Sequence, residues 1–183
     1  MLYIMRHGKT AWNAVHKLQG KKDVPLNEEG RQMVEEAGKR YRDTHFDVCY
    51  CSPLTRARET AEAVLRGRDV PIITDARLEE MSFGVCEGSM DFMVNPENPI
   101  HDLFCAPEKY VTPPEGGESL QALYARTGEF LREVVEPELR QGKDVLIVGH
   151  GAMNASIVCQ VRQMPVKNFW SAKMKNAELV RLI

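Results

Sequence analysis

The amino-acid sequence predicts an α/β fold: a three-layer α/β/α sandwich with a mostly parallel sheet and a small lid insertion. Short apolar runs of strand length alternate along the chain with longer segments of helical periodicity, which is the pattern of βαβ units. One segment, residues 88–118, interrupts this alternation and holds five of the ten prolines. The length of 183 residues and the 43% hydrophobic content predict a single domain over residues 1–183.

The predicted strands are short apolar runs that end at turn-forming or polar residues. The first, residues 2–5, ends before a glycine-containing turn, and a last run, residues 179–183, closes the sheet. The other three strand candidates are residues 46–51, 71–74 and 144–148.

Three helices are predicted from apolar residues that recur at helical spacing, and His150 is expected to open a further helix. Asn27 is a typical N-cap and begins a helix that runs to about residue 43. Pro53 is placed in the first turn of a second helix, which ends before Gly67. The third and clearest amphipathic helix starts at Ser119, and Pro137 kinks or ends it.

Charge and hydropathy exclude several classes of protein. Lys and Arg total 24 against 26 Asp and Glu, so no overall positive field exists to bind nucleic acid. No apolar run approaches the roughly 18 residues of a membrane-spanning helix. The N-terminal residues lack the pattern of a signal peptide, which predicts a cytoplasmic protein that does not bind membranes.

The cysteines and most of the histidines show no metal-ligand pattern. The five cysteines form an odd set without C-x-x-C spacing, so we expect reduced and mostly buried thiols. His16, His45 and His101 share no ligand spacing with one another or with the cysteines, and we expect them at the surface. The sequence therefore predicts neither a metal site nor a cofactor.

Polar residues with catalytic chemistry follow the predicted strands. His7 comes directly after the first strand, Arg56 follows the second, Glu80 the third and His150 the fourth. Because ligands of parallel sheets bind at the carboxyl ends of the strands, these side chains are expected to converge. Each also has a structural interpretation, as a buried histidine, a solvated arginine or a surface carboxylate.

The motifs around these residues resemble the histidine phosphatase superfamily, which includes cofactor-dependent phosphoglycerate mutases and many small phosphatases. The resemblance spans nearly the whole chain. It is carried by these ordered blocks: Arg6 to Asn13, Leu18-Gln19-Gly20, Asp23, Pro25-Leu26, Gly30, Ser52 to Ala57, Leu78 to Gly84, Gly116 to Ser119 and Val148 to Gly151.

The resemblance implies a role for each matching residue. His7 is the nucleophile that takes the phosphoryl group onto a ring nitrogen, and Glu80 matches the general acid. Arg6, Arg56 and His150 are expected around the phosphate. Further contacts to phosphate or substrate are implied for Asn13, Gln19, Gly20 and the backbone at Gly151.

Elementary chemistry agrees with these roles. Phosphoryl transfer depends mainly on positioning and on charge stabilisation, which two guanidiniums supply through fixed donors. His7 must be neutral to attack, and cationic neighbours lower its pKa. Glu80 must instead hold a proton when it donates to the leaving oxygen, which burial and the charge of the phosphate favour.

Two positions depart from the family pattern. Lys9 stands where an acidic or neutral polar residue is commoner, and Cys86 replaces the usual tryptophan. Neither change removes a catalytic group, but Cys86 affects the expected packing of the pocket wall and lid.

Three functions follow from these observations. The leading one is a metal-independent phosphomonoester hydrolase that acts through phosphohistidine on a small phosphorylated metabolite. The alternatives are a cofactor-dependent phosphoglycerate mutase and a catalytically idle domain that binds a phosphorylated ligand. Residues 88–118 offer Lys109 and His101 against six carboxylates, which favours the hydrolase. The oligomeric state stays open, with a homodimer as one alternative.

Overall fold

The computed structural model describes all 183 residues and shows a five-stranded sheet. The strand order is β3-β2-β4-β1-β5. Strands β3, β2, β4 and β1 are parallel, whereas β5 pairs with β1 in the antiparallel direction. The strands span β1 Leu2–Arg6, β2 Val48–Cys51, β3 Ile72–Thr74, β4 Val145–Gly149 and β5 Leu179–Arg181. The predicted α/β class and mostly parallel sheet are confirmed.

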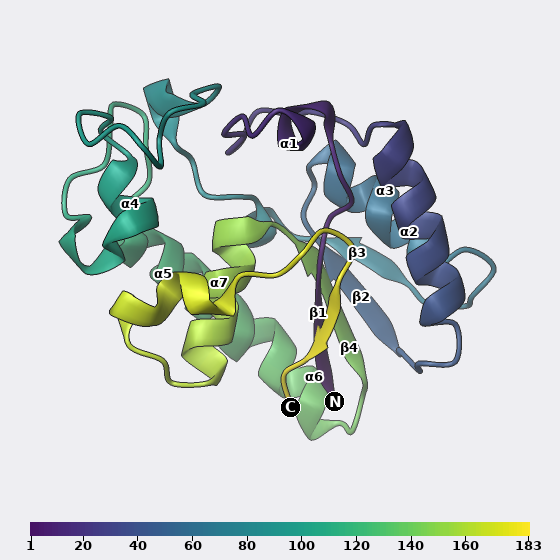
Figure 1. The fold of residues 1–183 in the computed structure, drawn as a ribbon. Coiled ribbons are helices and arrows are strands. Elements are labelled where there is room, and N and C mark those ends of the chain that lie inside the picture. The colour runs from purple at the N-terminus through teal and green to yellow at the C-terminus, as the bar shows by residue number, and fades with distance from the viewer.

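Helices cover both faces of the sheet (Figure 1). Helices α2 and α3 lie on one side, and α5, α6 and α7 lie on the other. The α-helices span α1 Ala11–Ala14, α2 Glu28–Arg40, α3 Thr55–Val64, α4 His101–Cys105, α5 Leu120–Phe130, α6 Glu136–Arg140 and α7 Gly151–Val161. A 3-10 helix, Val166–Ala172, precedes β5.

The two helical layers are explained by the alternation of side chains along buried strands. In β4, Val145 and Ile147 belong to the apolar cluster under α5 and α7, whereas Leu146 and Val148 belong to the cluster under α2 and α3. Successive side chains of a strand point to opposite faces, so a fully apolar strand needs a cover on each side.

The N-terminal signals of the predicted helices are confirmed more closely than their ends. Asn27 and Ser119 cap α2 and α5 through their side chains, as expected. Pro53, however, precedes α3 by two residues instead of lying in its first turn. Helix α2 ends at Arg40, three residues before the expected end.

Pro137 does not end the third predicted helix. The chain continues from α5 through a π-helical segment, Leu131–Val135, into α6, and Pro137 occupies the first turn of α6. Proline has no N–H to donate, and it is tolerated where a new helical segment begins. The wide turn of the π-helical segment provides such a beginning at Pro137.

Residues 88–118, which we call the insertion, leave and re-enter the fold at one place. At its start the N–H of Gly88 donates to Leu18 O over 2.7 Å, and at its end Gly117 forms an antiparallel bridge with Phe83. Within the insertion Phe104 stacks on Trp170 with ring centroids 5.0 Å apart. The insertion is therefore anchored to the fold at its root and along α4.

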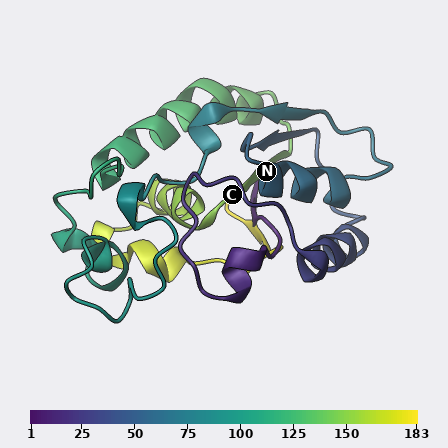
Figure 2. The ribbon, with the colours of Figure 1, turned by 90° about the horizontal axis from the view of Figure 1, so that it is seen from above.

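The insertion and α1 lie at the same end of the molecule, away from both termini (Figure 1). Figure 2 shows the segment that contains α1 between the insertion and the pair α2 and α3. No helix is long and apolar enough to cross a membrane. Four cysteines are buried and Cys105 is exposed, in agreement with the expectation of mostly buried thiols.

Candidate active site

Three parallel strands deliver polar residues to one edge of the sheet. Arg6 at the end of β1 is in register with Gly149 at the end of β4, so His7 and His150 follow side by side. The N–H of His7 also donates to Gly149 O over 2.9 Å. The centroids of the two imidazole rings are 5.2 Å apart. The parallel register thus places both histidines at one site.

The ring of His7 is held with one nitrogen fixed as a donor. Its Nδ1 donates to the carbonyl oxygen of Gly8 over 2.6 Å, so the lone pair of the neutral ring lies on Nε2. Only 3% of His7 is exposed. Burial lowers the pKa of His7 well below its ordinary value, and the charges of Arg56 and Arg6 lower it further. The ring of His7 is therefore neutral at physiological pH, with its lone pair on Nε2.

Two guanidiniums lie beside this ring without a bidentate carboxylate partner. Arg56 donates through Nη1 to Lys22 O over 2.8 Å and through Nη2 to Gly20 O over 2.7 Å. Arg6 donates through Nη1 to Met174 O over 3.0 Å. Burial lowers the pKa of both groups, whereas the nearby charge of Glu80 raises it. Neutral carbonyls orient these cations but do not cancel their charge.

His150 is fully buried and occupies the N-cap position of α7. Its Nε2 lies 2.7 Å from Ser52 Oγ, at the end of β2. Burial lowers the pKa of His150 well below its ordinary value, and the charge of Arg56 adds to that effect. The second ring is therefore also neutral.

Three buried nitrogens of the site have no hydrogen-bond partner in the protein. They are Arg6 Nε, Arg56 Nε and His150 Nδ1. Unpaired buried polar groups are costly, and they are retained where a ligand completes them. Two are donors on cations, so the ligand that fits is an anion with several acceptor oxygens, such as a phosphoryl group.

Glu80 is the carboxylate of this site, and α7 holds it. Its Oε2 accepts from the N–H of Ala152 over 3.1 Å, and its Oε1 accepts from the N–H groups of Met153 and Met81 over 3.0 and 2.8 Å. Free N–H groups at a helix N-terminus stabilise a negative charge. A Cβ placed on Gly151 would lie 3.5 Å from Glu80 Oε2 and 3.9 Å from Arg6 Cζ, so this glycine keeps the space between them open.

Asn13 and Gln19 meet at Thr10. The hydroxyl of Thr10 donates to Gln19 Oε1 over 2.8 Å, and the N–H of Thr10 donates to Asn13 Oδ1 over 3.1 Å. Both amide oxygens are thereby occupied, which leaves the two NH₂ groups as donors for a ligand. Gly20 enters the site differently, since its carbonyl holds Arg56.

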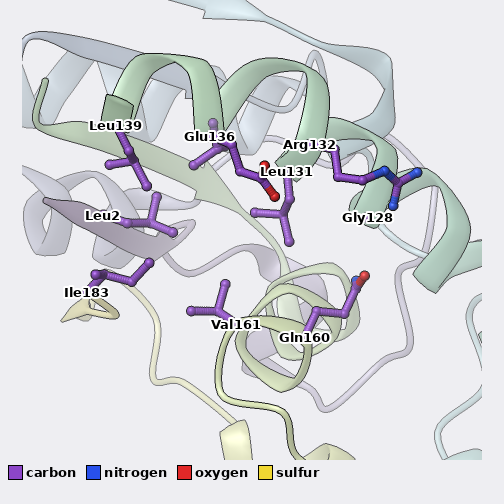
Figure 3. A pocket seen from close by; sticks show the side chains of 10 residues that line it. Leu2, Gly128, Leu131, Arg132, Glu136, Leu139, Gln160, Val161 and Ile183 are labelled. Atoms are coloured by element: carbon purple, nitrogen blue, oxygen red, sulfur yellow. The ribbon is translucent and has the colours of Figure 1, made fainter. Parts of the chain in front are cut away.

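A cavity of about 310 Å³ lies elsewhere, between α7, the start of β1 and the π-helical segment (Figure 3). Leu2, Leu131 and Val161 give it an apolar wall. None of the predicted site residues lines it, so it plays no part in the chemistry above.

The histidines outside the site follow the expectation in part. His16 and His45 are exposed, whereas His101 is partly buried. His45 lies close to Asp47 and Asp144, within the range of a shared cation. Asp144 Oδ1 already accepts from the N-terminal ammonium over 2.7 Å, however, and Asp47 Oδ2 accepts from the N–H of Asp144. These carboxylates tie the N-terminus to the sheet.

A family model for the histidine phosphatase superfamily, branch 1, matches residues 2–183. The chain belongs to this superfamily. Its relatives include a 2,3-bisphosphoglycerate-dependent phosphoglycerate mutase of Cytophaga hutchinsonii, 36% identical over 82% of this chain and 72% of the relative. Phosphoserine phosphatase 1 of Hydrogenobacter thermophilus is 29% identical over 96% and 82%. The structure of Bacillus stearothermophilus YhfR matches with a TM-score of 0.85, 34% identity and coverage of 97% and 88%.

Several supporting residues of this histidine phosphatase were missed by the sequence reasoning. Thr60 accepts from the N–H of Gly8 and donates to Arg56 O, which joins the His7 loop to α3. Asn176 donates to His7 O over 2.9 Å. Asp23 accepts from Thr55 N and Oγ1, and so caps α3. Asp23 belongs to one of the blocks that resemble the family, but the sequence around it does not indicate that it caps α3.

We predict that Arg56→Met lowers kcat/KM on the order of 10²-fold while the fold survives, because the group stabilises charge. Removing this cation also raises the pKa of His7, since Arg56 is one of the groups that lower it. Kinetics with p-nitrophenyl phosphate, NMR titration of the His7 imidazole and thermal melting measure the three effects. Arg58→Met, at an exposed position of the same helix, is the matched control. A large fall in melting temperature with unchanged turnover would show instead that Arg56 has a structural role.

Proposed function

We propose that this protein is a metal-independent phosphomonoester hydrolase that acts through a phosphohistidine intermediate on a small phosphorylated metabolite. The observation that carries the proposal is the state of His7. Its Nδ1 is committed to Gly8 O, its pKa is lowered by burial and by two guanidiniums, and its Nε2 keeps a lone pair. A neutral nucleophile beside two cations suits an anionic phosphate ester.

In the first step Nε2 of His7 attacks the phosphorus and the ester P–O bond breaks. Arg6, Arg56 and His150 Nδ1 donate to the phosphoryl oxygens, whose charge they stabilise. Glu80, as the general acid, transfers a proton to the departing alcohol oxygen. The products of this step are a free alcohol, N-phosphorylated His7 and ionised Glu80.

In the second step water attacks the phosphorus and the P–N bond breaks. The Glu80 carboxylate takes a proton from the water, and the electron pair of the P–N bond returns to Nε2. Inorganic phosphate then leaves, and both residues recover their starting states. Three N–H groups, from Met81, Ala152 and Met153, hold the carboxyl oxygens of Glu80 in place during this half of the cycle.

The distribution of charge around the site supports a hydrolase over a mutase. A mutase must retain a bisphosphorylated intermediate, which calls for additional cations over the pocket. In the first loops, Lys9 pairs with Glu29 and Lys21 pairs with Glu79, at 2.8 and 2.9 Å. Lys17 and Lys22 have no such pair, and Lys17 lies over the ring of Trp12. Few cations are therefore free to hold a second phosphate.

The phosphoglycerate mutase named among the relatives keeps the mutase as the second candidate. An idle phosphate-binding domain is less favoured, because nucleophile, acid and phosphate ligands all converge on one edge of the sheet. The difference between hydrolase and mutase lies in the fate of the phosphohistidine: transfer to water or to a second substrate hydroxyl.

The intermediate gives the first test. We predict that the protein forms an acid-labile phosphoenzyme on His7 that persists in the presence of a chelator. Rapid quench with labelled substrate followed by peptide mapping locates the label. His16→Asn, at an exposed histidine, serves as the control and should label normally. Label on a serine or cysteine, or a strict requirement for magnesium, would overturn the mechanism.

The second test concerns the role of Glu80. We predict that Glu80→Gln slows alkyl phosphates much more than nitrophenyl phosphate, because a weakly basic leaving oxygen needs little protonation. The ratio of the two rates within one variant is independent of how much protein is folded. Glu79→Gln, at the neighbouring carboxylate, should leave that ratio unchanged. Equal losses on both substrates in Glu80→Gln would mean that another group is the acid.

The third test separates hydrolase from mutase. We expect incubation with 3-phosphoglycerate and a trace of 2,3-bisphosphoglycerate to release phosphate faster than it forms 2-phosphoglycerate. Both products can be followed by ³¹P NMR in one sample. Faster isomerisation than phosphate release would establish the mutase instead.

A further inference from the structure

The loop between α1 and α2, residues 15–27, fixes the direction of the Arg56 side chain. Its two carbonyls at Gly20 and Lys22 accept the Nη2 and Nη1 hydrogen bonds of the guanidinium. Arg56 is 1% exposed, and its Nε has no partner. The position of the unpaired Nε therefore depends on where these two carbonyls stand.

A single carboxylate fixes the backbone at these carbonyls. Glu87 Oε1 accepts from the N–H of Lys21 and Glu87 Oε2 from the N–H of Lys22, each over 3.0 Å. Oε1 also accepts from the N–H of Phe83 over 3.2 Å, which ties the carboxylate to its own turn. Glu87 thus joins the root of the insertion to the α1–α2 loop, 66 residues away from Lys21.

Gly20 makes this contact sterically feasible. It has a φ of +56°, in the left-handed region that favours glycine. A Cβ at Gly20 would lie 2.2 Å from Glu87 Oε1, a distance that no side chain could occupy. The α1–α2 loop therefore has a glycine at the point where the Glu87 carboxylate packs against it.

One peptide group connects the two charges directly. The carbonyl of Gly20 accepts from Arg56, and the N–H of Lys21, in the same peptide group, donates to Glu87. The peptide bond is planar, so these two hydrogen bonds point in opposite directions along one dipole. A negative charge at the N–H end and a positive charge at the carbonyl end reinforce each other through that dipole.

We propose that Glu87 is a positioning residue for Arg56: it holds the backbone at residues 20–22 so that the guanidinium presents Nε to the phosphoryl group. This inference rests on the proposed function only in assigning phosphate as the ligand. Glu87 makes no direct hydrogen bond to Arg56, His7 or Glu80, so it acts through the loop.

The charges around Glu87 agree with this role. The Nζ of Lys21 pairs with Glu79, so Lys21 approaches Glu87 through its backbone and not through its ammonium. Burial lowers the pKa of Arg56, while the carboxylates of Glu80, Asp23 and Glu87 oppose that shift. Glu87 therefore supplies part of the counter-charge for the buried guanidinium without occupying its free donor.

A double-mutant cycle between Glu87→Gln and Arg56→Met tests the proposal. A glutamine keeps the size of the side chain, but its NH₂ group faces a backbone N–H and cannot accept from it. We measure kcat and KM on p-nitrophenyl phosphate and the inhibition constant of inorganic phosphate. Glu79→Gln is the matched control, because it removes the same charge from a group that contacts the Lys21 side chain.

In the wild-type background Glu87→Gln should lower kcat/KM and weaken phosphate binding on the order of tenfold, as expected for residues in one network. In the Arg56→Met background the same change should cost less than about twofold, since the residue it positions is gone. Glu79→Gln should have little effect in either background. Equal losses with and without Arg56, or full activity of Glu87→Gln, would overturn the proposal.

A second variant and a separate binding measurement cover the two ways in which the cycle could fail. If Glu87→Gln does not fold, Glu87→Asp enters the same cycle, because it keeps the charge while drawing the oxygens away from the loop. Failure of the proposed function is a separate outcome, seen when the wild-type protein does not hydrolyse p-nitrophenyl phosphate. Phosphate binding, followed by ³¹P NMR, then still reports the coupling between Glu87 and Arg56.

Discussion

The structure around the site depends on the burial of two arginine guanidiniums whose hydrogen bonds go to backbone carbonyls. Burying a cation is costly unless other groups compensate it. The fold compensates Arg6 and Arg56 with carbonyl dipoles and with the more distant charge of Glu80. An anionic ligand would supply the counter-charge that these two guanidiniums lack. Their burial therefore opposes the stability of the fold but favours the binding of an anion such as phosphate.

This positive field acts on the other ionisable groups of the site. It adds to burial in lowering the pKa of His7 and of His150, so both rings are neutral. Glu80 is drawn into the same region, where the N-terminus of α7 holds it with two N–H groups and Met81 adds a third. The two histidines and the carboxylate of Glu80 thus lie in one electrostatic environment.

The sheet supplies the geometry that makes this environment compact. Parallel pairing of β1, β2 and β4 brings their ends to one edge, and helices on both faces bury β2 and β4 completely and β1 in most of its length. Loops attached to this frame then carry the remaining groups, including the α1–α2 loop and the root of the insertion. The two loops touch near Gly20 and Glu87.

The sequence by itself determined the order of the five strands, the positions of the longer helices and the caps at Asn27 and Ser119, because these depend on local patterns. The strand ends and the family resemblance together indicated the five residues that converge. Only the tertiary structure decided which nitrogen of His7 is free, that α7 holds Glu80, and that Gly20 serves Arg56. The hydrogen bond from Ala152 to Glu80 spans 72 residues and that from Arg56 to Gly20 spans 36. Such contacts follow from how distant segments pack, and no local pattern in the sequence specifies that packing.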